Sequence, residues 1–203
     1  MIHSLSTENL SCVRGNRLVF RDLNFAVRGG EALAVEGANG SGKTSLLRML
    51  AGFLAPAGGA IRLKAKDAAH IEDSEERGKF VGWLGHHDAV KPQMTPRETL
   101  RFFCDFYANT DKIDFALEAA GLSRLADLPS QYLSAGQKKR LALARLKLSN
   151  RPLWLLDEPV AALDVSGKAL VAQLIQAHCA SGGIAIAATH EPLGGDCGHL
   201  HLA

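Results

Sequence analysis

Short apolar runs alternate with longer amphipathic stretches along most of this sequence. The segments at 153–156 and 184–189 are almost continuously apolar, which is typical of parallel strands that are buried on both faces. Further strands are expected at 5–12, 18–27, 32–36, 60–63 and 80–84. Helices are expected at 44–52, 95–107, 112–120, 134–148 and 166–180. This order of elements predicts an α/β fold built on a parallel sheet.

Helical signals concentrate in the middle of the chain. Thr95 and Glu98 fit a capping box with proline at the first helical position, and Ser134 with Gln137 fits a second one. We therefore predict a single domain over 1–203, in which a helical lobe at about 86–150 is inserted into a core formed by 1–85 and 151–203. Residues 64–79 carry closely spaced charges of both signs, so we expect a solvated surface connection there.

Composition narrows the class of protein. The 203 residues are 47% apolar and 22% charged, which is typical of one large globular domain. A formal net charge of +2 is too small to favour nucleic acid as a partner. No apolar run approaches the roughly 18–20 residues that cross a bilayer, so any membrane role is expected to come through a partner. The four cysteines, at 12, 104, 179 and 197, form no CxxC pair, which favours a reduced, cytosolic protein.

The stretch GANGSGKT at 37–44 has the spacing of a phosphate-binding loop, and it lies between an expected strand and an expected helix. Its glycines allow backbone N–H groups to converge on an anion, and the helix N-terminus adds positive potential. Lys43 is expected to reach the β- and γ-phosphates of a nucleotide, and the Thr44 hydroxyl to coordinate Mg²⁺. The predicted nucleotide contacts are Gly37, Ala38, Asn39, Gly40, Ser41, Gly42, Lys43, Thr44 and Ser45.

Two carboxylates follow the apolar run at 153–156. Open α/β sheets bind ligands at the carboxyl edge of their strands, so Asp157 is expected to hold Mg²⁺ and Glu158 to polarise an attacking water. His190 follows the strand at 184–189 and is predicted at the same edge, where an imidazole can bond a γ-phosphate. A histidine at a strand end is more often structural, so this role depends on a further motif.

That motif is LSAGQ at 133–137, a polar turn that offers a second helix N-terminus to an anion. Nothing in a single chain needs two such sites for one nucleotide. With GANGSGKT, LSAGQ, LWLLDEP, Ala162-Leu163-Asp164 and Thr189-His190 in this order, the sequence resembles the ATP-binding-cassette (ABC) ATPases over nearly its whole length. The resemblance implies a phosphate-loop core with a parallel sheet and an antiparallel N-terminal part, an inserted helical lobe, and Mg²⁺-dependent hydrolysis of ATP.

The family pattern also implies how the site is completed. In ABC ATPases the signature turn of one subunit closes over the ATP held by the other. The resemblance therefore implies a homodimer with two sites at a head-to-tail interface. The residues it implies are Ser134, Ala135, Gly136 and Gln137 for the contact in trans, Glu158 and His190 for catalysis, and Thr44 and Asp157 for Mg²⁺.

Three positions depart from the general family pattern. His86 stands where a glutamine usually precedes the lobe, Ala135 stands where glycine is commoner, and the aromatic residue that usually stacks on adenine falls at about Arg14. A guanidinium can also stack on a base. The W-x-G-H segment, Lys91, Glu98 and LSAGQ-x-x-R-x-x-L-A-R-L together resemble one subfamily, the ATPase subunit of the c-type cytochrome maturation system, usually called the haem exporter.

This subfamily resemblance implies integral membrane subunits as partners, a peripheral position on the cytoplasmic side of the inner membrane, and no nucleic acid. The segment from His86 to Thr95 is expected to dock on the membrane subunit. Three alternatives stay open: the ATPase of another ABC exporter, a non-transport ABC protein that acts on nucleic acid or ribosomes, and a regulator that does not hydrolyse ATP. A single cassette without sustained heptads argues against the second, and Glu158 with His190 argues against the third.

Two groups of histidines suggest a haem or metal site. His86 and His87 adjoin, so in an extended segment they point in opposite directions. Cys197, His199 and His201 alternate and would share one face of a strand. We favour an incidental position in a mobile C-terminus over direct ligation.

Overall fold

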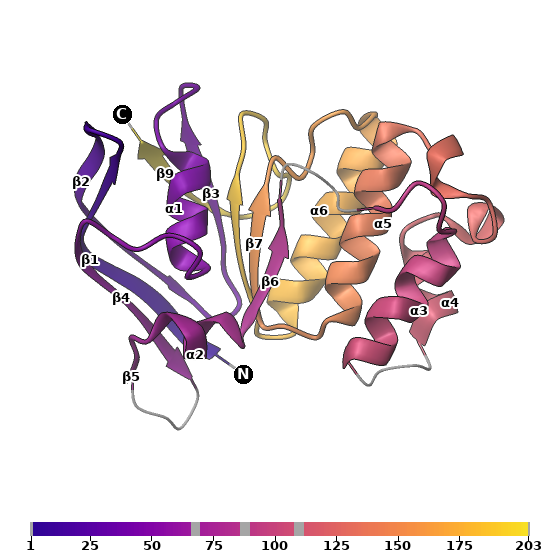
Figure 1. Ribbon diagram of the computed structural model, residues 1–203, viewed down its shortest axis with the longest axis horizontal. Coiled ribbons are helices and arrows are strands. Elements are labelled where there is room, and N and C mark those ends of the chain that lie inside the picture. The colour runs from indigo at the N-terminus through magenta and orange to yellow at the C-terminus, as the bar shows by residue number, and fades with distance from the viewer. Residues whose placement is uncertain (1, 66–69, 86–89, 108–111, 203) are drawn as a thin grey trace.

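A computed structural model shows two β-sheets with helices packed against them, and it describes residues 2–65, 70–85, 90–107 and 112–202 (Figure 1). The first sheet is antiparallel with strand order β2-β1-β4-β5, formed by β1 (Ile2–Arg14), β2 (Arg17–Arg28), β4 (Gly58–Ala65) and β5 (His70–Ile71). The second is parallel with order β6-β7-β8-β3-β9, formed by β3 (Ala32–Gly37), β6 (Val81–Leu84), β7 (Leu153–Asp157), β8 (Ile184–Ala188) and β9 (Gly198–Leu202). The expected fold class is confirmed.

The helices lie on both sides of the parallel sheet. In Figure 1, α1 lies on the side of the antiparallel sheet, α5 and α6 lie beyond β6 and β7, and α3 and α4 lie at the far end of the molecule. The bounds are α1 (Lys43–Leu50), α2 (Ser74–Gly78), α3 (Pro96–Tyr107), α4 (Ile113–Ala119), α5 (Ala135–Leu148) and α6 (Val165–Ala180), with short 3₁₀ turns η2 (Ser123–Leu125) and η3 (Ser130–Tyr132). Both 3₁₀ turns are too short to leave a periodic signal in the sequence.

Strand alternation explains why the central strands are apolar throughout. In β8, Ile184 and Ile186 pack into a core shared with α1 and the antiparallel sheet, whereas Ala185 and Ala187 face α5 and α6. Helix α5 is likewise buried on two faces: Leu143 packs toward the sheet and Leu141 toward α3 and α4. The lobe helices are therefore fixed to the sheet through α5.

The expectation of a solvated connection over 64–79 is wrong in two respects. Part of this segment forms β5 and α2, and Asp73 caps the N-terminus of α2, where its Oδ1 accepts from the Glu76 N–H at 2.8 Å. Arg77 is only 3% exposed. Its guanidinium donates to the carbonyls of Leu50 (2.9 Å) and Met49 (3.3 Å), and so it binds the carbonyl end of α1. Burial lowers the pKa of Arg77.

The expectation of a mobile C-terminus is also corrected, because residues 198–202 form the fifth strand of the parallel sheet. In β9, His199 pairs with Ala34 and His201 with Glu36. Leu200 and Leu202 pack against the core, while the two histidines between them face outward. Because these polar residues alternate with the leucines, the sequence gives only a weak indication of a strand that is buried on one face.

Candidate nucleotide-binding and hydrolysis site

The phosphate loop follows β3 and leads into α1, as its spacing predicts. Gly37 and Gly42 have φ values of 147° and 101°, which favour glycine. A Cβ atom on Gly37 would lie 2.4 Å from the Leu202 carbonyl oxygen of β9, and one on Gly42 would lie 2.5 Å from Val19 Cγ1 of β2. Atoms of both sheets therefore lie in close contact with the loop, and only glycine fits at these two positions.

Lys43 is the first residue of α1 and is only 7% exposed. Its ammonium donates to the carbonyl oxygens of Gly37 (2.8 Å) and Ala38 (3.1 Å), so it lies over the loop. Its Nζ is also 2.9 Å from Nε2 of His190. Because an ammonium group can only donate, Nε2 of His190 accepts in this contact. A cation and an imidazole that lie 147 positions apart in the sequence thus contact each other.

Thr44 and Asp157 join the loop to the parallel sheet. The Thr44 hydroxyl lies 3.1 Å from each carboxylate oxygen of Asp157. Asp157 is the last residue of β7 and is 4% exposed. The two oxygen donors that the sequence predicts as Mg²⁺ ligands are therefore in direct contact.

Backbone hydrogen bonds fix the next two polar side chains. The Glu158 N–H donates to the Ala188 carbonyl of β8 at 2.9 Å and holds Glu158 at φ 50°, an uncommon conformation for this residue type. The fully buried Thr189 donates through its N–H to Val35 at 3.1 Å, so His190 follows directly at the sheet edge. Oε1 of Glu158 lies 3.7 Å from Nε2 of His190.

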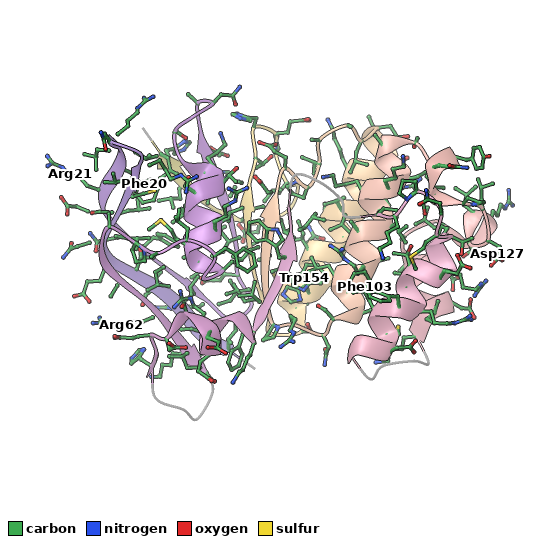
Figure 2. All side chains as sticks on the ribbon, viewed as in Figure 1. Phe20, Arg21, Arg62, Phe103, Asp127 and Trp154 are labelled. Carbon is green, nitrogen blue, oxygen red and sulfur yellow. The ribbon has the colours of Figure 1, made fainter. Side chains whose placement is uncertain are left out.

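These residues line one cleft of about 650 Å³. Its lining residues are Arg14, Arg17, Val19, Asn39, Gly40, Gly42, Lys43, Thr44, Ser45, Arg48, Asp157, Glu158 and His190. Gly37, Ala38 and Ser41 form the loop beneath it, and Figure 2 shows Phe20 directed from β2 toward α1, where the ring borders Gly42. Sequence reasoning missed Arg17 and Arg48. Arg48 lies four residues after Thr44 on one helix, and that spacing was the available signal.

The signature turn forms the predicted capping box. The Ser134 Oγ accepts from the Gln137 N–H at 3.2 Å, and the Gln137 Oε1 accepts from the Ser134 N–H at 2.8 Å. Gly136 lies against Ala162 and Leu163, which lead into α6. None of the four residues 134–137 lines the cleft of its own chain. Figure 1 shows why: α5 and α1 lie on different sides of the central strands.

The remaining candidates for a haem or metal site are His86 with His87 and the group Cys197, His199 and His201. His86 and His87 lie outside the described residues. Nδ1 of His199 lies 2.9 Å from one carboxylate oxygen of Glu36, and Nδ1 of His201 lies 3.4 Å from the other. Cys197 Sγ is 3.9 Å from Nε2 of His199. Over the ranges that the structure describes, no three ligating side chains are arranged to hold a metal ion.

A larger cavity of about 780 Å³ lies at the amino ends of β7 and β8. Trp154 stacks on His178 there, with ring centroids 3.9 Å apart. Burial lowers the pKa of His178 to about 4, so this imidazole is neutral near pH 7. No residue predicted from the sequence as a site residue lines this cavity.

In the described part of the chain, no helix has the length and apolar character needed to cross a membrane. The ABC transporter family model matches residues 20–161.

Proteins of known sequence and structure resemble the chain over nearly its full length. The cytochrome c biogenesis ATP-binding export protein CcmA of Rhodopseudomonas palustris (strain HaA2) is 50% identical, over 94% of this chain and 93% of that protein. CcmA of Bradyrhizobium diazoefficiens is 47% identical, over 98% and 97%. A putative ABC transporter ATP-binding protein from Pyrococcus furiosus has a TM-score of 0.84 at 25% identity, over 98% and 97%. The dimeric, ADP- and phosphate-bound ATP-binding cassette MJ0796 has a TM-score of 0.76 at 23% identity, over 92% and 88%. The chain therefore belongs to the ABC transporter ATPases and, within them, to the family of the cytochrome c biogenesis ATP-binding export protein CcmA.

Proposed function

We propose that this chain is the energy-coupling ATPase subunit of a membrane complex for c-type cytochrome biogenesis, nominally a haem exporter. As a member of the ABC transporter ATPases, the chain hydrolyses ATP. One observation carries the assignment of the site: Lys43 contacts His190 at 2.9 Å while the adjoining Thr44 contacts Asp157 at 3.1 Å. Three segments far apart in sequence thereby meet at the cleft. The CcmA proteins named above support the link to cytochrome c biogenesis.

In this proposal residues 37–45 bind the triphosphate. Lys43 is held over the loop by two neutral carbonyl groups. Anionic phosphate oxygens are stronger acceptors than carbonyl oxygens, so ATP takes over these hydrogen bonds when it binds. The N–H groups at the start of α1 face the same anion.

Thr44 and Asp157 are the residues that we assign to Mg²⁺. A hydroxyl and a carboxylate in contact at 3.1 Å provide the hard oxygen donors that this ion prefers. When bound, Mg²⁺ neutralises charge that develops on the phosphates.

We assign Glu158 and His190 to the activation and orientation of the water that attacks the γ-phosphate. The Glu158 side chain is 22% exposed and opens into the cleft, so its carboxylate can accept a proton from a water placed against the γ-phosphate. His190 lies between Lys43 and Glu158 and orients the phosphate and the water. Neither carboxylate nor imidazole needs to leave the sheet edge for this step.

The site is completed by a second copy of the chain. Residues 134–137 do not line the cleft of their own subunit, and the similar cassette MJ0796 is described as dimeric. We propose a head-to-tail homodimer in which Ser134, Ala135, Gly136 and Gln137 contact the ATP of the partner. Each chain is one nucleotide-binding domain over 1–203 with its lobe at about 86–150. It lies peripherally on the cytoplasmic side of the inner membrane, bound to integral membrane proteins of cytochrome c maturation and to no nucleic acid.

Lys43→Ala should raise the dissociation constant for ATP by roughly 10-fold or more, because a charge-assisted hydrogen bond to phosphate is lost. Titration with a fluorescent ATP analogue measures the change. Lys64→Ala, which removes an exposed lysine of β4, is the matched control and should leave the constant unchanged. An unchanged ATP affinity in Lys43→Ala would contradict the loop assignment.

Purification of the chain from membranes, followed by identification of the proteins that accompany it, tests the proposed function directly. Membrane subunits of cytochrome c maturation are the expected partners, and those of an unrelated exporter would overturn that assignment.

Lys91→Glu should reduce the recovery of these membrane subunits by roughly tenfold, because it reverses a charge on the segment that we expect to dock on them. Lys91 is exposed, and its Nζ lies 5.7 Å from the Phe102 ring centroid. Lys64→Glu is the control. A larger loss of ATPase activity in the isolated chain than of partner recovery would make this segment catalytic.

A further inference from the structure

The cavity of about 780 Å³ at the amino ends of β7 and β8 lies at the opposite edge of the parallel sheet from the nucleotide cleft. It is lined by the segments that lead into these strands, at 150–152 and 181–183, and by parts of α4, α5 and α6. Figure 2 shows Trp154 where β7 faces α5 and α6. No described residue lines both the cavity and the cleft. Its volume falls within the roughly 300–1,000 Å³ of small-molecule sites, so the cavity has room for a ligand of its own.

One wall of the cavity is a stacked pair of rings. Trp154 and His178 have ring centroids 3.9 Å apart and planes within 9° of parallel. Nε2 of His178 lies 3.2 Å from the Ile184 carbonyl oxygen and donates to it, since a carbonyl group can only accept. A Cβ atom on Gly183 would lie 2.3 Å from this nitrogen, so a glycine is needed beside the ring. The wall is therefore preformed and planar, and its neutral imidazole adds no charge.

The cavity carries positive charge that no lining carboxylate neutralises. Lys112, Lys147 and Arg151 line it, and none of the described lining residues is acidic. The Nζ of Lys147 lies 4.9 Å from the ring centroid of Phe115, which also lines the cavity and is 59% exposed. Charges interact more strongly beside apolar groups than in open water. The cavity thus favours a ligand that joins an acidic group to an apolar body.

We infer that this cavity binds an amphiphilic aromatic anion, a flat apolar ring system that packs on the wall of Trp154 and His178 and carries an acidic group toward Lys147. The inference goes beyond the proposed function and does not depend on it, because the cavity and the nucleotide cleft share no lining residue. It gives the chain a second ligand site, at the edge of the sheet opposite to the phosphate loop.

The first test uses a matched pair of probes. 8-Anilinonaphthalene-1-sulfonate (ANS) joins an aromatic ring system to a sulfonate, and N-phenyl-1-naphthylamine is the same ring system without it. Fluorescence titration of the wild-type chain should show one ANS site with a dissociation constant of about 100 μM or lower, which excess ATP does not displace. The uncharged amine should bind roughly tenfold more weakly or worse. Displacement of ANS by ATP, or equal affinity for the two probes, would overturn the inference.

The second test fills the cavity. Ala177→Trp places an indole among the lining residues on α6, and it should weaken ANS binding by roughly tenfold or more. Ala180→Trp is the matched control, because it makes the same change at an exposed residue of the same helix that does not line the cavity. It should leave the affinity unchanged, and thermal unfolding shows whether both variants are folded. A loss of affinity in both variants, or in neither, would overturn the inference.

Lys147→Glu tests the charge without filling the cavity. It should weaken ANS binding by roughly tenfold or more, because attraction of the sulfonate becomes repulsion, whereas the uncharged amine should bind as before. Lys64→Glu is the control on β4. An unchanged ANS affinity in Lys147→Glu would overturn the inference.

ATP hydrolysis separates this inference from the proposed function. None of the substituted residues lines the cleft, so Ala177→Trp and Lys147→Glu should both hydrolyse ATP. A wild-type chain that binds ANS in the cavity but does not hydrolyse ATP would defeat the proposed function alone. A chain that hydrolyses ATP but binds no ANS would defeat this inference alone.

Discussion

Glu158→Gln should lower kcat for ATP hydrolysis by about 100-fold or more, because the water loses the carboxylate that polarises it. ATP affinity should stay within about threefold of wild type, since the phosphate contacts of Lys43 are untouched. The amide has nearly the same shape, so the backbone bond from the Glu158 N–H to Ala188 persists. The variant should therefore accumulate as an ATP-bound dimer, which size-exclusion chromatography with ATP detects.

Glu75→Gln is the matched control, because Glu75 is exposed in the first turn of α2 and does not line the cleft. It should leave kcat unchanged. Wild-type turnover in Glu158→Gln would remove Glu158 from the mechanism and transfer the role of base to another group. A loss of ATP binding of the same size as the loss of kcat would instead show that Glu158 acts on affinity.

The phosphate loop was predictable because its chemistry is local. Glycines at 37, 40 and 42 and the Lys-Thr pair after them define a backbone turn and a helix start within eight residues. The capping boxes at Thr95 and Ser134 were predictable for the same reason, and hydrogen bonds confirm both. Contacts between residues only a few positions apart are visible in the sequence as a characteristic spacing of residue types.

Features that depend on packing between residues far apart in the sequence have no such characteristic spacing. Arg77 is charged, yet it is buried, because its guanidinium donates hydrogen bonds to the carbonyls at the end of α1. A mobile C-terminus was expected in place of the strand β9, because its two outward histidines interrupt the apolar pattern and its pairing partner, β3, lies far away in the sequence. Arg17 and Arg48 reach the cleft from a hairpin and a helix that meet only in the fold.

Catalysis should need two chains, and mutant chains should complement each other. Ser134→Arg places a large cation where the signature turn would meet the γ-phosphate of the partner, and Lys43→Ala disables the phosphate loop. Each homodimer then has two defective sites, so both proteins alone should be nearly inactive. Ser74→Arg is the matched control, because it places the same side chain at the start of α2, away from the cleft. It should leave turnover unchanged.

Mixing Ser134→Arg chains with Lys43→Ala chains should restore activity, because a mixed dimer collects both lesions in one site and leaves the other site intact. With free exchange, half of the dimers are mixed, so about a quarter of wild-type activity should return if the two sites act independently. The Ser134 hydroxyl and the adjoining N–H groups of α5 would then stabilise transition-state charge across the interface, as an arginine supplied in trans does in other nucleotide hydrolases. Specific activity of the wild type should also rise with protein concentration until the dimer saturates. Activity that stays constant down to a demonstrated monomer would reject the trans-acting signature, because a monomer brings no second turn to its own cleft.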